Sequence, residues 1–300
     1  MTFRKLITHD NCADGLASAM IVRDAFPDIE VVFAQYGQPS LEALPAEEGL
    51  LFCDITPPRE RVAEFVAAGA TVLDHHKHAR DIVEAFGVRG VFADEIARPG
   101  WCGAVLAYTH LWVPTRWEGL PNIDVVSRFA HWTGIRDTWQ RDSLEWEAAN
   151  DLHSVLMGLP REFWLRPGAI SKALGGDMLE LGRLFRDKRL DKAQGLAASG
   201  CILVRGADNR VWGTFPDSAA YTSDVAEALR EQGVPLCCGW FQQVTNGRLE
   251  TVLSLRSDGS VDVGALAATF GGGGHSRAAG CRIDESNAMA AVARVTAGRP

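Results

Sequence analysis

The sequence lacks the cysteine spacing of a structural zinc site or a disulfide framework. Its seven cysteines are single residues except for the pair Cys237-Cys238, and no Cys-x-x-Cys occurs. Scattered cysteines of this kind are typical of reduced thiols in a cytoplasmic protein. We therefore expect free thiols rather than a disulfide-stabilised fold.

Long apolar runs are absent as well. No stretch approaches the ~20 residues of a membrane-spanning helix. Met1–Lys5 leads directly into the strand-like Leu6-Ile7, without the apolar region of a signal peptide. These absences predict a soluble, cytoplasmic protein that does not bind a membrane.

Positive charge is scarce. The 30 Lys and Arg are outnumbered by 38 Asp and Glu, which gives a formal net charge of −8 and argues against a basic surface for duplex nucleic acid. Phosphates can still bind where a few cations converge or where metal ions supply the charge. With 47% apolar and 23% charged residues among 300, the chain has the composition of one large or two ordinary folded domains.

The first ninety-odd residues alternate between strand-like and helix-like segments. The expected strands are Lys5–Thr8, Ile29–Ala34, Gly49–Cys53 and Thr71–Leu73, and the expected helices are Leu16–Phe26 and Arg59–Ala68. Alternation of this kind predicts a parallel sheet with crossover helices.

Three of these strands end on acidic or imidazole side chains: His9 to Asp14, Asp54, and Asp74 to His76. A single Asp in such a place is usually a helix cap or a turn residue. Parallel strands, however, all end at the same edge of their sheet, where open α/β proteins place their chemistry.

Further along, Val125–Trp132 leads into an expected turn, Thr133–Trp139, that has Asp137 at its centre beside Arg136. An ion pair at the surface is the simpler interpretation of Arg136 and Asp137.

The composition changes near Ser199-Gly200, where we expect a second domain to begin after the amphipathic helices Glu145–Leu156 and Asp177–Ala198. Its expected strands are Cys201–Arg205, Val211–Phe215, Leu236–Val244, Leu249–Leu255 and Ala278–Ile283, with helices at Asp224–Glu231 and Val263–Phe270. The predicted division is 1–160 for the first domain, 161–199 for a helical linker and 200–300 for the second domain.

Four consecutive glycines, Gly271 to Gly274, precede His275 and Arg277. Ordering such a run costs backbone entropy, so it is expected where a partner approaches the backbone closely. Bare amides flanked by His and Arg predict a binding site for an anion. The alternative, a flexible linker, does not suit a segment that lies between an apolar helix and a strand.

Carboxylates and imidazoles without cysteine clusters favour Mn²⁺, Mg²⁺ or a similar divalent ion. The side chains suffice for two ions bridged by one carboxylate, which would polarise a phosphoryl group and activate water for in-line attack. A glycine-rich anion site on a second domain would hold another phosphate. The residues themselves therefore predict a phosphoester hydrolase for a substrate with more than one phosphate.

The motifs also resemble those of a known family. His9-x-x-Cys12-x-Asp14-Gly15, Asp54, Asp74-His75-His76, Arg136-Asp137-x-Trp139 and Gly-Gly-Gly-Gly-His, in this order, resemble the DHH phosphoesterase superfamily. The C-terminal part resembles its DHHA1 substrate-binding domain. The resemblance implies a RecJ-like fold: a parallel-sheet catalytic domain, a helical linker and a smaller α/β domain.

The resemblance also implies a dinuclear site, typically with Mn²⁺. The expected metal ligands are His9, Asp14, Asp54 as the bridging carboxylate, His75 and Asp137. Asp74 would be a ligand or would orient one. His76 would lie beside the scissile phosphate as an acid or an electrostatic stabiliser. The residues expected to bind the rest of the substrate are Gly272, Gly273, Gly274, His275, Arg277, Arg256 and Lys77.

One position departs from the family pattern. Many members carry an Asp where this chain has Cys12, and the nearest acid before it is Asp10. One ion is therefore expected to be held by Cys12, by Asp10 or by fewer protein ligands. A thiolate would shift the preference from Mn²⁺, Mg²⁺ or Co²⁺ towards Zn²⁺.

The leading functional hypothesis is a nanoRNase-like phosphodiesterase that acts from the 5′ end of short single-stranded RNA or DNA, or on linear dinucleotides. Trp101, Trp132 and Trp139 could stack a base, although core packing is the commoner role of such residues. The alternatives are an exopolyphosphatase, a 3′-phosphoadenosine 5′-phosphate phosphatase, or a nucleotide sensor without hydrolytic activity. Both a monomer and a homodimer are compatible with the sequence.

Overall fold

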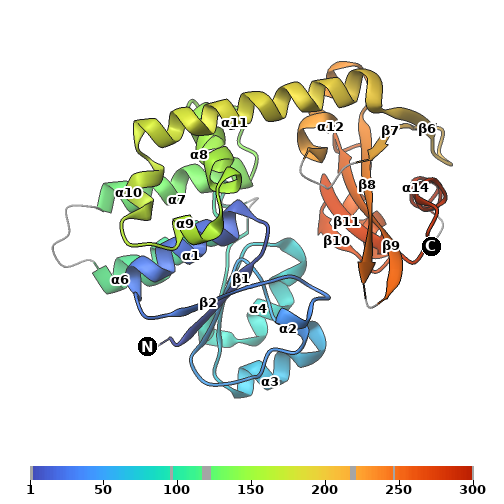
Figure 1. Cartoon of the computed structure of the whole chain (residues 1–300). Helices are drawn as coiled ribbons and strands as arrows, with labels where there is room; N and C mark the ends of the chain where they lie inside the picture. Colours follow the sequence, from blue (N-terminus) through green and yellow to red (C-terminus); the bar gives the residue numbers. More distant parts are fainter. Residues whose placement is uncertain (1–2, 95–96, 117–122, 217–220, 246, 299–300) are drawn as a thin grey trace. The chain divides into compact units, whose positions relative to one another are not determined.

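The computed structural model describes residues 3–94, 97–116, 123–216, 221–245 and 247–298. It divides into two compact units, Met1–Arg186 and Asp187–Pro300. Each unit has its own sheet and its own buried core (Figure 1). The fold class is α/β with an N-terminal parallel sheet and a smaller C-terminal α/β unit, as the sequence predicts.

Unit 1 is built on a parallel sheet with the strand order β2-β1-β3-β4-β5. The strands are β1 Lys5–His9, β2 Glu30–Ala34, β3 Leu50–Cys53, β4 Thr71–Asp74 and β5 Gly90–Phe92. Every residue of β3 and β4 is buried, which is the pattern of central parallel strands that are covered on both faces.

Helices cover both faces of this sheet (Figure 1). One apolar core contains side chains of α1 Ala13–Ala25, α5 Gly103–Ala107, α7 Ile123–Asp137, α8 Trp146–Gly158 and α10 Ala169–Ala173. The other lies under α2 Pro39–Glu42, α3 Val62–Ala67 and α4 Arg80–Ala85. Shorter elements are α6 Val113–Arg116, α9 Arg161–Trp164, the 3₁₀ turns Arg59–Arg61, Lys77–Ala79 and Gly87–Arg89, and a π-helical turn at Tyr108–Trp112.

Two helices extend further than the sequence patterns predict. Helix α1 begins at Ala13 rather than Leu16, so Asp14 and Gly15 are helical instead of forming a polar turn. Helix α7 continues to Asp137, so the expected turn Thr133–Trp139 is wrong over most of its length. A Cβ atom at Gly134 would lie 2.0 Å from the Gly100 carbonyl oxygen. This glycine permits close packing within a helix rather than ending one.

Unit 2 contains a mixed sheet with the order β10-β11-β9-β8-β7-β6. Its strands are β6 Ile202–Arg205, β7 Val211–Pro216, β8 Leu236–Thr245, β9 Arg248–Ser257, β10 Gly273–His275 and β11 Ala278–Ile283. Its helices are α12 Thr222–Glu231, α13 Val263–Ala268 and α14 Ala288–Thr296. Helix α11, Gly176–Gly195, leads from unit 1 into unit 2 and is followed by a π-helical turn at Leu196–Gly200.

The seven cysteines are all free thiols, which agrees with the prediction from their spacing. Among the described residues, no helix combines the length and apolar character that crossing a bilayer requires.

Candidate metal centre

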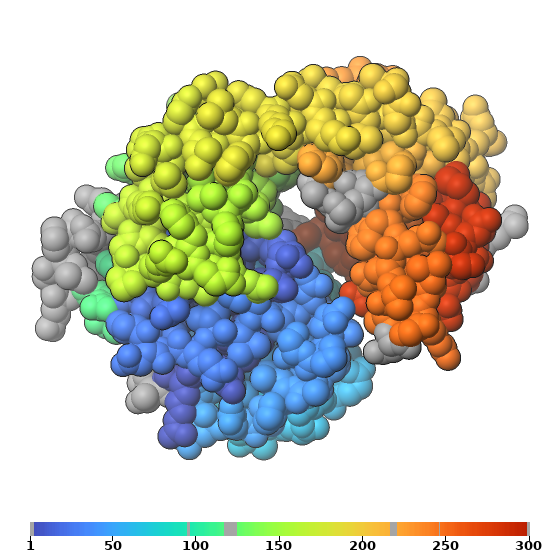
Figure 2. Space-filling view, in the orientation of Figure 1, coloured from blue at the N-terminus to red at the C-terminus, as the bar shows by residue number. Residues whose placement is uncertain are grey.

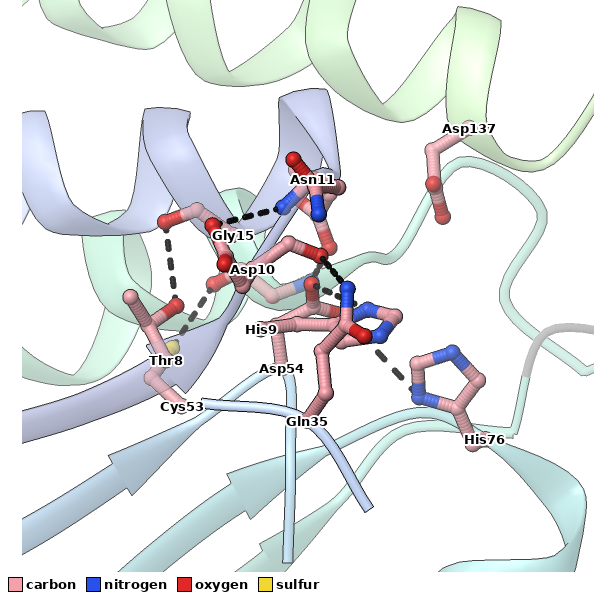
Figure 3. Close-up of polar contacts among 12 residues, drawn as sticks. Thr8, His9, Asp10, Asn11, Gly15, Gln35, Cys53, Asp54, His76 and Asp137 are labelled. Atoms are coloured by element: carbon pink, nitrogen blue, oxygen red, sulfur yellow. Dashed lines mark hydrogen bonds and ion pairs between the residues drawn. The ribbon is translucent and has the colours of Figure 1, made fainter. Parts of the chain in front are cut away.

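Three adjacent strands of unit 1 deliver polar side chains to one edge of the sheet. His9 is the last residue of β1, Asp54 follows β3, and Asp74 is the last residue of β4. The strand order reverses between β1 and β3, and such a switch point is where doubly wound sheets form their binding crevice. His9 and Asp54 therefore lie at the place that the topology favours for a site (Figure 3).

Asp14 comes to the same edge from the first turn of α1. Its side chain is buried, and its two oxygens accept hydrogen bonds from the backbone amides of Gly103 (2.6 Å) and Ala104 (2.8 Å). These amides belong to the first residues of α5, where helix N–H groups have no partner within the helix. The two amides fix the direction of the Asp14 carboxylate.

Carboxylates converge on one imidazole nitrogen. His75 Nε2 lies 3.2 Å from Asp54 Oδ1, 3.6 Å from Asp137 Oδ2 and 3.7 Å from Asp14 Oδ2. Asp137 comes from the last turn of α7 and is separated from His75 by 62 positions in the sequence (137 minus 75). Asp14, His75 and Asp137 form one group of potential ligands whose atoms lie within 4.8 Å of one another.

A second group on the other side of Asp54 consists of His9, Cys12 and Asp54 itself. His9 Nδ1 lies 3.9 Å from Asp54 Oδ2, a buried oxygen that accepts no hydrogen bond within the described part of the protein. Asp54 also belongs to a third group with His75 and His76. Asp54 thus belongs to two of the three groups. A carboxylate shared in this way is what the family resemblance implies for the bridging ligand.

The backbone of Asp54 has a φ of +64°, in the left-handed region that non-glycine residues rarely adopt. Such a conformation costs on the order of 1–3 kcal/mol and persists where surrounding contacts impose it, most often at functional sites. Here it directs a buried carboxylate towards the His9 and His75 rings. The observation supports a functional role for Asp54 independently of the motif.

Asp74 holds the Asp-His-His segment together. Its Oδ1 accepts hydrogen bonds from the backbone amides of His75 (2.6 Å) and His76 (2.8 Å) and lies 2.8 Å from His76 Nδ1. Burial by itself would raise the pKa of Asp74, but the nearby His76 and His75 rings and these hydrogen bonds bring it down to about 2. Asp74 is therefore an anion that orients His76, and within the described residues it is outside the three ligand groups.

The electrostatics of the cluster favour a cation. Burial and the neighbouring carboxylates raise the pKa values of Asp14 and Asp54 well above the usual range. Burial, with the charges of Asp137 and Asp14, also raises the pKa of the Cys12 thiol to about 12. Acids gathered in a buried place without a compensating cation retain protons, and a bound divalent ion reverses this tendency. The donor set of carboxylate, imidazole and one thiol fits divalent metal ions.

Metal binding should stabilise unit 1. At a Mn²⁺ concentration 100-fold above the dissociation constant, we expect about 2.7 kcal/mol of stabilisation, which raises the thermal midpoint by about 5–10 °C over that in EDTA. Because the ion must displace protons from carboxylates with raised pKa values, the shift should shrink as the pH falls. Differential scanning calorimetry between pH 5 and 8 measures this. A shift that grows at low pH would contradict the assignment.

Gly103 is a site residue that the sequence patterns did not reveal. A Cβ atom there would lie 2.6 Å from Asp54 Cβ, 2.9 Å from Asp14 Oδ2 and 2.9 Å from Ser18 Oγ. Only glycine lets the start of α5 donate to the Asp14 carboxylate while lying this close to the Asp54 side chain. A single glycine at a helix start carries no such signal in the sequence.

Replacing Gly103 by alanine should therefore displace the carboxylates. We expect at least a 10-fold loss of Mn²⁺ affinity and a loss of stability of about 1–3 kcal/mol, as for other overpacked sites. Isothermal titration calorimetry and denaturant unfolding measure the two effects. Gly176→Ala is the matched control, because a Cβ atom at Gly176 meets nothing within 4 Å, and it should change neither.

Asp10 lies apart from the cluster. Its Oδ1 accepts hydrogen bonds from Asn11 N and from Arg161 Nη1, both at 2.9 Å. Among the described residues, Asp10 belongs to none of the three ligand groups, whereas Cys12 belongs to one. The sequence left three alternatives open for this position: Cys12, Asp10 or fewer protein ligands. Between the two residues, the geometry favours Cys12. Lys77 is exposed and begins the 3₁₀ turn after His76.

The glycine run of unit 2 is more regular than the sequence indicated. Gly273–His275 forms strand β10, which pairs antiparallel with β11, and the Gly271 and Gly272 amides donate to the Ala268 and Ala267 carbonyls. The expectation of bare amides is wrong for Gly271 and Gly272. At Gly272 and Gly274 a Cβ atom would collide with the backbone of β11, while at Gly273 it would meet open space. At Gly272 and Gly274, glycine is therefore required by the close approach of β11.

Three residues expected to bind substrate, His275, Arg277 and Arg256, lie near one another along the backbone of the unit 2 sheet. Arg256 on β9 is paired in register with Ala278 on β11, and Ala278 is paired with His275 on β10. Arg277 lies in the turn between β10 and β11. Arg256 Nε donates to Ser223 Oγ at 3.0 Å, and the Arg277 side chain is exposed. His275 is half-buried.

Comparisons with known proteins agree with this architecture. Residues 219–297 match the DHHA1 domain family. A solved DHH domain structure, described as coming from a member of a ribosomal protein family, aligns with 97% of this chain and 85% of its own length, with a TM-score of 0.65 and 13% identity. A pGpG-specific phosphodiesterase, PggH from Vibrio cholerae, aligns with 98% of this chain and 97% of its own, with a TM-score of 0.53 and 15% identity. At these identities the structural likeness shows the fold. No curated protein matches the sequence significantly.

Proposed function

We propose that this chain, whose residues 219–297 match the DHHA1 domain family and whose fold is that of a solved DHH domain structure, is a metal-dependent phosphodiesterase of the DHH superfamily that acts on short single-stranded oligonucleotides or linear dinucleotides. The observation that carries the proposal is the convergence of Asp14, Asp54 and Asp137 on His75, with His9 and Cys12 on the other side of Asp54. A structural relative that is a pGpG-specific phosphodiesterase supports a small nucleotide substrate. The net charge of −8 also favours a short substrate over a long strand.

The ligand groups provide for two divalent ions. His9, Cys12 and Asp54 would hold one, and Asp14, His75 and Asp137, together with Asp54, would hold the other. Such ions neutralise charge on a phosphoryl group and make water a nucleophile near neutral pH. Mn²⁺ is the proposed ion, and the Cys12 thiol is the feature that would admit softer ions such as Co²⁺ or Zn²⁺.

In this proposal His76 acts on the phosphate. Its Nδ1 lies 2.8 Å from Asp74, and the negative charge of Asp74 favours a protonated imidazole. With a proton held at Nδ1, the opposite nitrogen Nε2 is directed away from Asp74 and can donate a proton or a hydrogen bond to a phosphate oxygen. The chain thus supplies an oriented acid in addition to the ligands.

Unit 2 would bind the distal end of the substrate through His275, Arg277 and Arg256. Replacing His275 by alanine should raise KM about 10-fold with little change in kcat, because a distal contact contributes equally to ground-state and transition-state binding. Steady-state kinetics with a dinucleotide measures this. An unchanged KM would exclude His275 from substrate binding.

The test of the function is Mn²⁺-dependent release of mononucleotides from 5′-phosphorylated RNA of increasing length, beginning with the dinucleotide. We expect the fastest turnover on the shortest substrates and none with His75→Ala, which removes the imidazole common to two ligand groups. Hydrolysis of polyphosphate or of 3′-phosphoadenosine 5′-phosphate, with none of any oligonucleotide, would refute the proposal. Binding of nucleotides without turnover under any divalent ion would indicate a sensor instead.

A further inference from the structure

A cavity of about 330 Å³ lies in unit 1 beside the candidate metal ligand Cys12. It lies between the start of α1, strand β2 and the segment that joins α8 to α9. In Figure 2 the yellow-green part of the chain, which includes α9, lies directly against the blue N-terminal part. This volume is at the lower end of the range for ligand pockets, so it suits one small ring system rather than an extended strand.

One wall of the cavity is apolar. Leu16 from α1, Phe33 from β2 and Leu156 and Met157 from α8 contribute to it. Met157 is 44% exposed although it is a large apolar side chain. An exposed apolar surface at the mouth of a cavity is a feature of binding sites for flat, partly apolar ligands.

The cavity also carries polar groups and a planar cation. The Arg161 guanidinium lies over the Phe33 ring, with Cζ 4.8 Å from the ring centroid, and its Nη1 donates to Asp10 Oδ1 at 2.9 Å. Asn11, with a φ of +54°, contributes an exposed amide side chain to the same cavity. Gln35 Nε2 donates to the Asp10 carbonyl oxygen and fixes this loop (Figure 3).

We propose that this cavity binds the nucleobase of the nucleotide whose phosphate lies at the metal centre. Guanidinium planes and apolar side chains are the surfaces on which single-stranded bases stack, and amide and carboxylate groups read their hydrogen-bonding edges. The cavity offers both kinds of surface, and Cys12 belongs to its lining and to a ligand group. Base and phosphate would thus bind to adjoining parts of one unit.

This inference rests on the proposed function and makes it more specific. A polyphosphate chain has no ring to stack, so a base pocket beside the phosphate site selects nucleotides over other phosphoesters. Arg161 and Met157 then determine specificity by contacting the substrate. The pocket lies entirely in unit 1 and requires no contribution from the glycine-rich segment of unit 2.

The experiment compares three RNA dinucleotides: the intact molecule, one with an abasic 5′ residue and one with an abasic 3′ residue. Stacking contributes about 1–3 kcal/mol per base, so removal of the bound base should lower kcat/KM about 5- to 150-fold for one of the two abasic substrates. Arg161→Ala should lower kcat/KM for the intact dinucleotide and leave that abasic substrate unaffected. Equal losses by Arg161→Ala on the intact and both abasic dinucleotides would overturn the proposal.

A direct binding measurement separates failure of the pocket from failure of the proposed function. The probe is 2-aminopurine riboside 5′-monophosphate, whose fluorescence changes when its base stacks. We expect a saturable change with the wild type, at least 5-fold weaker binding by Arg161→Ala and by Met157→Glu, and unaltered binding by Arg166→Ala, an exposed arginine outside this cavity. Absence of a fluorescence change, or equal binding by all variants, would refute the base pocket even if dinucleotides were hydrolysed. If the fluorescence results are as expected but no dinucleotide is hydrolysed, the pocket is supported and the proposed function is refuted.

Discussion

Asp54→Asn is expected to abolish binding of both metal ions and, with it, hydrolysis. Asp54 is common to neighbouring ligand groups, so its loss removes a ligand from each ion. Because loss of a hydrogen-bond partner of a ligand alone costs 10- to 100-fold in affinity, we expect a decrease of more than about 100-fold. Metal content after dialysis against Mn²⁺, measured by inductively coupled plasma mass spectrometry, should fall from two ions to less than one. Asparagine tolerates the left-handed backbone of this position, so the fold should persist.

In the metal-free protein, the same substitution should leave the thermal stability unchanged or raise it. Burial raises the pKa of Asp54, so its ionised form destabilises the fold near neutral pH and the destabilisation is relieved as the pH falls through that raised pKa. An uncharged amide removes this cost. In EDTA, Asp54→Asn should therefore unfold at the same temperature as the wild type or higher, while the Mn²⁺-induced shift disappears. Asp81→Asn, which removes an exposed partner of Arg59, is the control and should keep the full shift.

His76→Ala is expected to lower kcat by about 10²- to 10⁴-fold, the usual contribution of a general acid or base, while two Mn²⁺ ions remain bound. His76 is oriented by Asp74 and is 21% exposed in its side chain, whereas the His75 side chain is 1% exposed. From this difference we expect His75 to bind the ions and His76 to contact the substrate. Loss of metal from the His76→Ala protein would show that His76 is a ligand instead.

The pH profile provides a second readout for His76. If a protonated His76 donates to the phosphate, kcat of the wild type falls on the alkaline side as the imidazole loses its proton, and this limb is absent in His76→Ala. Asp74→Asn should shift the limb to lower pH, because removal of the adjacent negative charge disfavours the imidazolium. An unaltered limb in both variants would exclude His76 as the titrating group.

The sequence by itself determined the parallel sheet and the edge at which its chemistry lies. Strand periodicity is local, and side chains that directly follow parallel strands must share one edge, so His9, Asp54 and Asp74 could be placed together from their positions alone. The second α/β unit and its strands were also recognisable, because buried strands and amphipathic helices carry strong local patterns. The family resemblance to a DHH protein with a DHHA1 domain rested on motifs that the domain comparison confirms at the C-terminal end.

Tertiary structure alone decided how the cluster is held. The amides that fix Asp14 come from Gly103 and Ala104, and the left-handed backbone of Asp54, which Asp adopts more readily than most residues, is not signalled by the pattern of the sequence around it. The extent of α7 depends on Gly134 packing against Gly100, and two of the four glycines before His275 serve strand pairing within unit 2. The cavity beside Cys12 likewise requires α8 and α9 to pack over β2. Local patterns describe which faces are buried, but contacts between distant segments set the direction of individual side chains, and the chemistry of this protein depends on those directions.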